Sequence, residues 1–206
     1  MNAANLSGLL QGFFANHLRG QLGASQHTVA SYRDTFRLLL KFASKRYHRQ
    51  ASDLHVEQLD AKFISAFLND LEHGRNNCPR TRNNRLSAIH AFFRFVCVNE
   101  PAHASHCQRV LAVPMKRFER GAVEFLSREE TAALVEAPDS RTWLGRRDRL
   151  LLEVAVQTGL RNSELIHLRR LDVHLGPEAN IKCLGKGRKT RCTPLRAPLA
   201  ARLSDW

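Results

Sequence analysis

Apolar side chains at helical spacing dominate the first hundred residues, and this pattern constrains the fold more than any other feature of the sequence. Side chains three or four positions apart share one face of a helix, so such a stripe predicts a helix with one buried side. Four stripes occur, over about residues 6–18, 28–47, 61–73 and 79–98. Thr28 is expected to cap the second helix, Asp60 precedes the third, and Pro79 suits the first turn of the fourth. We therefore predict a four-helix domain in this half of the chain.

Residues 99–122 interrupt the helical pattern. They contain Pro114 and Gly121 together with a basic run from Lys116 to Arg120, a composition typical of the connection between two domains. We predict a helical domain over residues 1–110, a linker over 111–122 and a second domain over 123–206. The basic run can lie along a phosphate backbone or simply be solvated, and the sequence leaves both interpretations open.

The second half of the chain mixes helices with a β-hairpin. Ser127 and Glu130 form the capping-box pattern that begins a helix, and a longer helix is expected to end at Gly159. The predicted elements are helices at about 127–137, 144–158, 163–168 and from 198, and strands at about 180–184 and 191–195. The predicted fold class is mainly α with a small β-hairpin or sheet.

The chain is strongly basic, with 32 Lys and Arg residues, 19 Asp and Glu residues and a formal net charge of +13. This charge repels itself unless a polyanion balances it, and nucleic acid is the most common such partner. An anionic membrane is the rival, but the basic residues occur in every segment instead of lining one face of an amphipathic helix. Arginine outnumbers lysine, which suits bidentate phosphate contacts or reflects a GC-rich genome; both explanations remain open.

Neither a membrane span nor a secretory signal is evident in the sequence. No apolar run approaches the roughly 20 residues that cross a bilayer, and the N-terminus lacks the basic start and apolar stretch of a signal peptide. Five cysteines without Cys-x-x-Cys spacing indicate free thiols in a reducing compartment. His103, His106 and Cys107 lie close together, but no second group of ligands follows, so no metal is expected. We predict a soluble, cytoplasmic protein without a metal.

The most specific motif is the octapeptide TGLRNSEL at residues 158–165. Gly159 lets the chain turn sharply after a buried helix, so that Arg161 stands where the next short helix begins. Amide donors and the helix dipole favour an anion at that point, where a guanidinium can bind a phosphate. Glu164 lies one turn later and can hold Arg161 or cap the amides. On these eight residues alone, a surface ion pair worth about 0–1 kcal/mol is the simpler interpretation.

The turn of the predicted hairpin is a second candidate site. Lys186 stands between Gly185 and Gly187, and glycines allow the backbone to approach a groove closely. Arg188, Lys189 and Arg191 add positive charge around it. Contact with phosphate is therefore preferred over a solvated turn.

The two motifs together resemble the tyrosine recombinase (phage integrase) family in residue type, order and spacing. The matching pattern is TGLRxSEL at 158–165, Asp172, and GKGxKxRxxPL at 185–195, while the patterns at 28–38 and 82–93 are similar to that family's core-binding domain. The resemblance implies a four-helix SAM-like core-binding domain followed by an incomplete α+β catalytic domain. The residues that it implies at the DNA interface are Thr28, Tyr32, Arg33, Arg82, Arg85, Arg188, Lys189 and Arg191.

The resemblance also implies a reaction. In this family a tyrosine attacks a DNA phosphate to form a 3′-phosphotyrosyl link, which a 5′-hydroxyl later reverses, so neither a metal nor a cofactor is needed. Arg161 matches the first catalytic arginine, which neutralises charge on the non-bridging oxygens. Lys186 matches the hairpin lysine that protonates the leaving 5′-oxygen, and Glu164 matches a supporting position. Double-stranded DNA is the expected partner, with self-association or active relatives on paired sites.

The family's remaining catalytic residues, a His-x-x-Arg motif, a further His or Trp and the nucleophilic Tyr, have no matching positions after the hairpin. Tyr32 and Tyr47 lie in the helical half, and the His-x-x-Arg at 106–109 precedes Arg161, so we attribute it to chance. We therefore expect a recombinase-type chain that cannot cleave DNA alone, from a truncated, degenerate or split gene, with an incomplete core that exposes apolar surface. Two alternatives are a non-catalytic DNA-binding regulator or architectural protein and a type IB topoisomerase-like enzyme, which fits the helical half less well.

Overall fold

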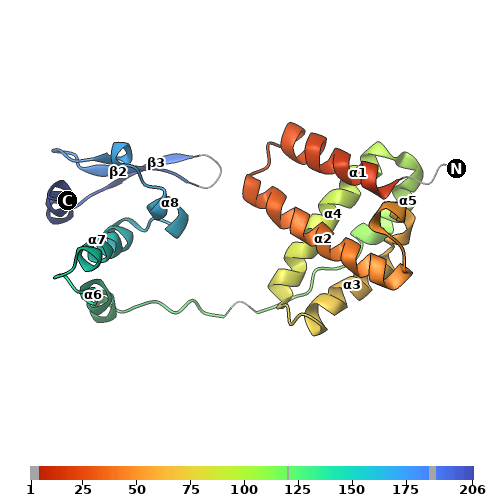
Figure 1. Cartoon of the computed structure of the whole chain (residues 1–206), viewed down its shortest axis with the longest axis horizontal. Coiled ribbons are helices and arrows are strands. Elements are labelled where there is room, and N and C mark those ends of the chain that lie inside the picture. Colours follow the sequence, from red (N-terminus) through yellow and green to blue (C-terminus); the bar gives the residue numbers. More distant parts are fainter. Residues whose placement is uncertain (1–4, 120, 186–188) are drawn as a thin grey trace. The chain divides into compact units, whose positions relative to one another are not determined.

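The computed structural model describes residues 5–119, 121–185 and 189–206, and it divides into two compact units, residues 1–121 and residues 122–206 (Figure 1). The fold is mainly helical with one small sheet, as the sequence predicted. Within the described ranges, no helix is long and apolar enough to cross a membrane.

The first unit is built from helices, and a helix forms over each of the four predicted apolar stripes. Its main elements are α1 (Leu6–Gly12), a π-helical continuation (Phe13–Gln21), α2 (Gln26–Tyr47), α3 (Ala61–His73), α4 (Pro79–Asn99) and α5 (Ala104–Leu111). The predicted cap of α2 was wrong: Ser25 Oγ accepts a hydrogen bond from the Thr28 amide at 3.2 Å, and Thr28 lies within the first turn. Both side chains suit a cap, and the apolar stripe begins only at Val29, so periodicity could not distinguish them.

Aromatic rings form the centre of this unit. Phe13 packs edge-on against Phe92, with 5.5 Å between the ring centroids, and Phe36 lies 5.1 Å from Phe92. All three side chains are buried, and burying a side chain of this size contributes about 1.5–3 kcal/mol. These contacts join the π-helical segment, α2 and α4, so the unit has a core of its own.

Helix α5 lies in the region where the sequence showed only an interruption. Pro101 begins a 3-10 turn (Pro101–His103), which leads directly into α5. Cys107 and Val110 of α5 are fully buried within the core of the first unit. An isolated helix of this length is marginal in water, so packing against the neighbouring helices stabilises it.

The second unit combines helices with a three-stranded antiparallel sheet. Its elements are α6 (Arg128–Glu136), α7 (Trp143–Thr158), α8 (Asn162–Ile166), a 3-10 turn (Arg170–Asp172), β1 (Val173–His174), β2 (Asn180–Leu184), β3 (Thr190–Pro194) and α9 (Ala197–Ser204). The predicted capping box at Ser127 and Glu130 is present, and Gly159 ends α7 with a φ of +61°, a left-handed conformation that favours glycine. The strand order is β1-β2-β3.

The hairpin pairs Ile181 with Thr193 and Cys183 with Arg191. Ile181 and Cys183 are buried, while Lys182 between them is exposed, so alternate side chains of β2 face the core. Strand β1 was not predicted, because two residues are too few to show an alternating pattern. The pairing of Val173 with Ile181 completes the sheet.

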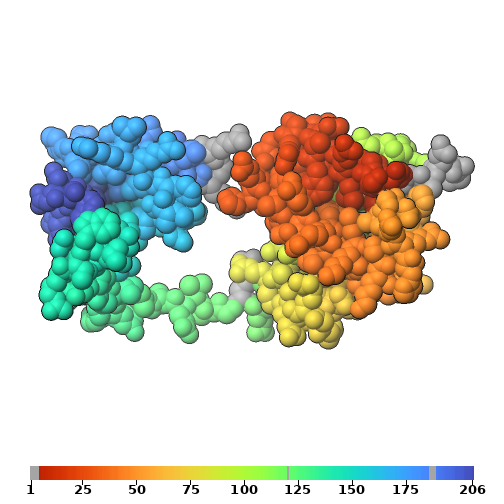
Figure 2. All heavy atoms as spheres, in the orientation of Figure 1, coloured from red at the N-terminus to blue at the C-terminus, as the bar shows by residue number. Residues whose placement is uncertain are grey.

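The core of the second unit is small, and much apolar surface lies outside it. Its buried residues are Val154, Leu160, Ile181, Cys183, Leu195 and Leu199. Residues 121–126 form neither helix nor strand, and Figure 2 draws this part of the chain as a thin run of green spheres. Within it, Val123 and Phe125 are 88% and 91% exposed. Other exposed apolar side chains in this unit include Trp143, Leu144, Val156, Ile166, Leu171 and Trp206. The expected exposure of apolar surface is therefore present.

Candidate nucleic-acid interface

Arg161 lies between α7 and α8 and presents its side chain to solvent. Gly159 turns the chain after α7, Leu160 is buried, and the extended backbone of Arg161 precedes the first turn of α8. The Arg161 side chain is 60% exposed. A guanidinium anchored in this way carries a full positive charge and several hydrogen-bond donors that can reach an anion.

The carboxylate of Glu164 holds this arrangement in place and is itself only 6% exposed. Its Oε2 accepts a hydrogen bond from the Arg161 backbone amide at 2.8 Å, and its Oε1 accepts one from Arg161 Nη1 at 3.0 Å. Both functions predicted for Glu164, holding Arg161 and capping the amides, therefore occur together. The carboxylate also accepts a bidentate pair from Arg191 of β3, at 3.0 Å from Nη1 and 2.7 Å from Nη2.

This concentration of donors keeps Glu164 ionised. Hydrogen bonds from the Arg191 side chain, followed by the one from the Arg161 backbone amide, lower the pKa of Glu164 to about 2. The pKa of Arg191 is raised by its hydrogen bonds to Glu164. At neutral pH the cluster therefore holds two guanidinium groups and one carboxylate, a net charge of +1, with Arg161 the more exposed of the two cations.

The hairpin brings further basic residues to the same unit. The Gly185 amide donates to the Lys189 carbonyl at 2.8 Å, which closes the base of the turn, and the Lys189 side chain is exposed. Lys186 and Arg188, the predicted catalytic lysine and one predicted DNA contact, lie outside the described residues. The predicted convergence of Arg161 and Lys186 on one phosphate therefore stays a prediction.

Two of the predicted DNA contacts on α2 are exposed and one is partly buried. Thr28 and Arg33 are exposed, so either can reach a ligand. Tyr32 is half-buried, and its ring stacks on that of Phe13 with 6.4 Å between centroids. Tyr32 therefore contributes to the aromatic core, and part of its ring remains accessible.

Arg85 holds two helices together. Its Nη1 donates to the Ser31 carbonyl and to Thr35 Oγ1, both at 3.1 Å, so this side chain of α4 binds α2. Thr35 is fully buried. Arg85 itself is partly exposed, so the same guanidinium that joins the helices can also face a ligand.

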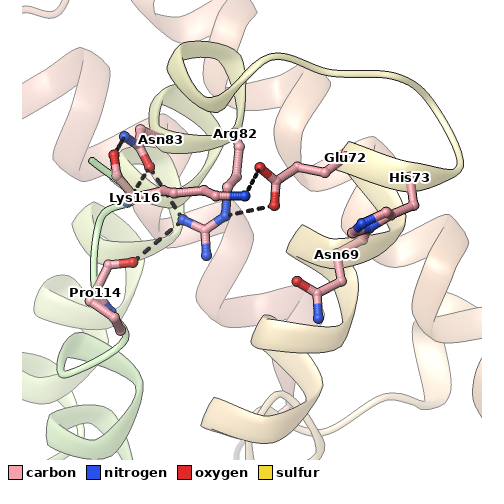
Figure 3. Close-up of polar contacts among 7 residues, drawn as sticks. All are labelled: Asn69, Glu72, His73, Arg82, Asn83, Pro114 and Lys116. Carbon is pink, nitrogen blue, oxygen red and sulfur yellow. Dashed lines mark hydrogen bonds and ion pairs between the residues drawn. The ribbon is translucent and has the colours of Figure 1, made fainter. Parts of the chain in front are cut away.

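Arg82 is buried in a polar network instead of facing solvent (Figure 3). Its Nε lies 3.5 Å from Glu72 Oε2 of α3, and its Nη1 donates to the Pro114 carbonyl at 3.4 Å. Glu72 also accepts a hydrogen bond from Lys116 Nζ at 2.9 Å, and this bond is the main cause that lowers the pKa of Glu72. The geometry favours a structural role for Arg82 over the predicted contact with DNA.

Asn83 completes this network and fixes the start of the connection between the units. Its side-chain amide donates to the Lys116 carbonyl at 2.7 Å, and its Oδ1 accepts from the Lys116 amide at 2.9 Å (Figure 3). In the sequence, Lys116 belongs to a basic run for which a solvated linker and a phosphate contact were both open interpretations. No local pattern identifies this contact, because Asn83 and Lys116 are 33 residues apart.

His103, His106 and Cys107 make contacts of other kinds in the fold. In the part of the chain that the structure describes, no group of three or more His, Cys, Asp or Glu residues is arranged to hold a metal ion. His103 instead lies 3.4 Å from Glu57, and Cys107 is packed in the core.

Family comparisons match both units. Residues 12–98 match the phage integrase N-terminal SAM-like domain, and residues 124–206 match the phage integrase family. A protein of Sinorhizobium fredii (strain NGR234) named as integrase/recombinase y4rC is 51% identical over 203 residues, which cover 98% of this chain and 61% of that protein. A second, named y4rD, is 40% identical over 97% of this chain and 71% of its own length. Tyrosine recombinase XerC of Xanthomonas campestris is 33% identical over 94% of this chain and 56% of its own length.

Solved structures share the fold at low sequence identity. The XerH recombinase bound to palindromic difH in a post-cleavage complex gives a TM-score of 0.65 at 21% identity, over 92% of this chain and 55% of that chain. A lambda integrase dimer bound to a COC′ core site gives a TM-score of 0.63 at 20% identity, over 92% and 62%. This chain therefore spans a little over half the length of several proteins that it matches.

Proposed function

This chain belongs to the phage integrase family of tyrosine recombinases, and from that membership we propose that it binds duplex DNA in site-specific recombination. The observation that carries the proposal is the exposed Arg161 guanidinium, which the buried carboxylate of Glu164 holds on a strongly basic chain. The charge of +13 supports a polyanionic partner. Two recombinases of similar fold were solved on their sites, XerH on a palindromic difH substrate and lambda integrase on a COC′ core site.

In this proposal Arg161 binds the phosphate that reacts. Its positive charge stabilises the charge that builds on the non-bridging oxygens as the phosphorus is attacked. Lys186, at the hairpin turn, is the proposed acid that protonates the leaving 5′-oxygen. Lys189 and Arg188 add contacts to neighbouring phosphates, and Arg33 with Thr28 does so from the helical unit.

We further propose that residues 1–206 bind DNA without cleaving it. The contacts of both tyrosines support this proposal: the Tyr32 ring stacks on Phe13 in the aromatic core, and the Tyr47 hydroxyl donates to the Gln58 carbonyl at 2.8 Å. Burial also raises the pKa of Tyr47, which disfavours the phenolate. Cleavage by the family's reaction would need a tyrosine from outside these residues, and without one the chain acts as a DNA-binding regulator at recombination sites.

The proposed partners are duplex DNA and other recombinase molecules on paired sites. The related lambda integrase structure is described as a dimer on its core site, and the exposed apolar side chains of the second unit provide surface for contacts of this kind. Sedimentation of the chain with and without duplex DNA tests this part, since association is expected to increase on DNA.

A salt titration of binding to a labelled random-sequence duplex tests the main proposal. Affinity is expected to fall steeply between about 50 and 200 mM salt, because each neutralised phosphate releases a counterion. Arg161→Ala should weaken binding roughly tenfold and reduce the slope by about one phosphate contact. The matched control is Arg141→Ala, which removes an equally positive but 89% exposed side chain elsewhere in the unit. Equal effects of the two substitutions would contradict the role of Arg161.

A nicked suicide substrate separates binding from cleavage. The chain is expected to retard this DNA in a gel but to form no covalent adduct that survives denaturation. A covalent adduct formed by residues 1–206 alone would refute the proposal that they do not cleave DNA.

A further inference from the structure

Arg191 was predicted to contact DNA, but its guanidinium faces Glu164. Both Nη atoms donate to the two carboxylate oxygens, the bidentate geometry that gives the strongest side-chain ion pairs. Arg161 uses one Nη atom and its backbone amide on the same carboxylate. Within the described residues, no hydrogen bond occupies Nε or Nη2 of Arg161, so these donors remain available to a ligand.

The base of the hairpin turn, at Gly185, leaves space for the ion pair between Arg191 and Glu164. A Cβ atom at Gly185 would lie 2.8 Å from Arg191 Nη1 and 3.5 Å from Glu164 Oε1. The absent side chain at Gly185 therefore makes room for the guanidinium at the base of the turn. Glu164 and Arg191 are 27 residues apart, so their ion pair joins the start of α8 to the strand that leaves the turn.

We propose that Arg191 is a positioning residue that acts through Glu164 to hold Arg161 and the hairpin in one arrangement for a DNA phosphate. The proposal rests on the proposed function of Arg161 as a phosphate ligand. Arg191 satisfies both oxygens of the carboxylate, so Glu164 needs only one donor from the Arg161 side chain. Without Arg191, Arg161 is the one cationic partner that Glu164 retains among the described residues, and the Arg161 guanidinium turns from the phosphate toward the carboxylate.

A double-mutant cycle distinguishes positioning from direct contact. Arg191→Ala is expected to weaken binding to the random-sequence duplex roughly tenfold, about as much as loss of a charged hydrogen bond. In a Glu164→Gln background the same substitution should have a much smaller effect on affinity, because the carboxylate through which Arg191 acts on Arg161 is already absent. Equal fold-losses in the two backgrounds would show that Arg191 touches DNA directly and would overturn the proposal.

The pH dependence gives a signature that simple destabilisation does not produce. Among the described residues, the charged groups that face Glu164 are Arg161 and Arg191. With Arg191 removed, the pKa of Glu164 is expected to rise toward the ordinary value of a glutamate, about 4.3, so protonation of Glu164 as the pH falls from about 5 to 3.5 releases Arg161. The affinity of Arg191→Ala relative to that of the unsubstituted chain should therefore recover as the pH falls. A constant ratio over this range would overturn the proposal.

Carboxyl titration by NMR on the free chain tests the contact independently of DNA. The pKa of Glu164 should rise in Arg191→Ala and rise less in Arg191→Lys, which keeps the charge but not the fork of donors. Lys189→Ala, which removes an exposed cation two residues earlier, should leave this pKa unchanged. An unchanged Glu164 pKa in both Arg191 variants would refute the positioning role. If the pKa shifts while Arg161→Ala binds DNA normally, only the proposed function fails.

Discussion

The buried network around Arg82 provides the most discriminating prediction about the helical unit. The resemblance assigned Arg82 to the DNA interface, whereas the structure pairs it with Glu72 and the Pro114 carbonyl (Figure 3). Both charged side chains are 11% exposed. The two assignments differ in what Arg82→Ala should do, because a structural residue affects unfolding and a DNA contact affects the salt dependence of binding.

The expected magnitudes follow from which partners remain. Removing one member of a buried ion pair costs about 3–5 kcal/mol when the other is left unpaired. After Arg82→Ala, Glu72 keeps Lys116 at 2.9 Å, so we expect a smaller loss of about 1–2 kcal/mol, partly from the packing of the arginine stem. After Glu72→Ala, the acceptors that Arg82 keeps in the described part of the chain are the neutral Asn83 Oδ1 and the Pro114 carbonyl. We therefore expect a loss of about 3 kcal/mol in the free energy of unfolding.

The assay combines urea unfolding, followed by helical circular dichroism, with the salt titration of DNA binding. Arg82→Ala should lower the free energy of unfolding and leave the slope of binding against salt unchanged. Arg80→Ala is the control, since it removes an exposed arginine near the start of the same helix. A stable Arg82→Ala variant whose slope falls by about 0.9, the value for one lost phosphate contact, would refute the structural assignment.

Three further predictions concern the buried histidines, helix α5 and Gly185. Burial lowers the pKa values of His90 and His106, so both imidazoles are neutral in the folded chain at pH 7. The free energy of unfolding should therefore hold above about pH 6.5 and fall as the pH drops, a loss that His106→Gln should reduce in urea titrations at several pH values. Val110→Ala should cost about 1–3 kcal/mol and speed amide exchange in α5, because the side chain is fully buried against the core; unchanged exchange would mean that packing does not hold this helix. Gly185→Ala should leave the chain folded but displace the flexible end of Arg191, so NMR should show a raised pKa for Glu164; an unaltered value would mean that the space at Gly185 is not needed for the ion pair.

Local patterns were sufficient for the helices that carry a long apolar stripe. The stripes predicted α2, α3, α4 and α7 to within a few residues, because each helix buries one continuous face. They did not predict α5 or β1, which are too short for a period to be recognised and which depend on packing or pairing with residues distant in the sequence. The capping box before α6 was predictable because its two side chains are three residues apart.

In the candidate site, too, contacts between neighbouring residues were predictable and contacts between distant segments were not. The octapeptide predicted the contact between Arg161 and Glu164, because both residues lie within one turn. No local pattern could predict that Arg191 shares this carboxylate, or that Arg82 is buried beside Glu72. The contact of Arg191 joins segments distant in the sequence, and that of Arg82 joins two different helices. Residue type alone identifies a cation but not whether its partner is a phosphate or a carboxylate.

The amino-acid sequence by itself determined the mainly helical fold class, the positive charge and the pairing of neighbouring residues, because these follow from composition and from spacing within a turn. It also carried the resemblance to the family, through the motifs at 158–165 and 185–195. The tertiary structure alone decided which arginine side chains stay largely exposed. Arg161 and Arg33 keep exposed side chains, whereas Arg82 and Arg191 are held by Glu72 and Glu164. The physical reason is that a guanidinium takes whichever anionic partner folding brings within hydrogen-bond distance, and only packing between distant segments brings those carboxylates there.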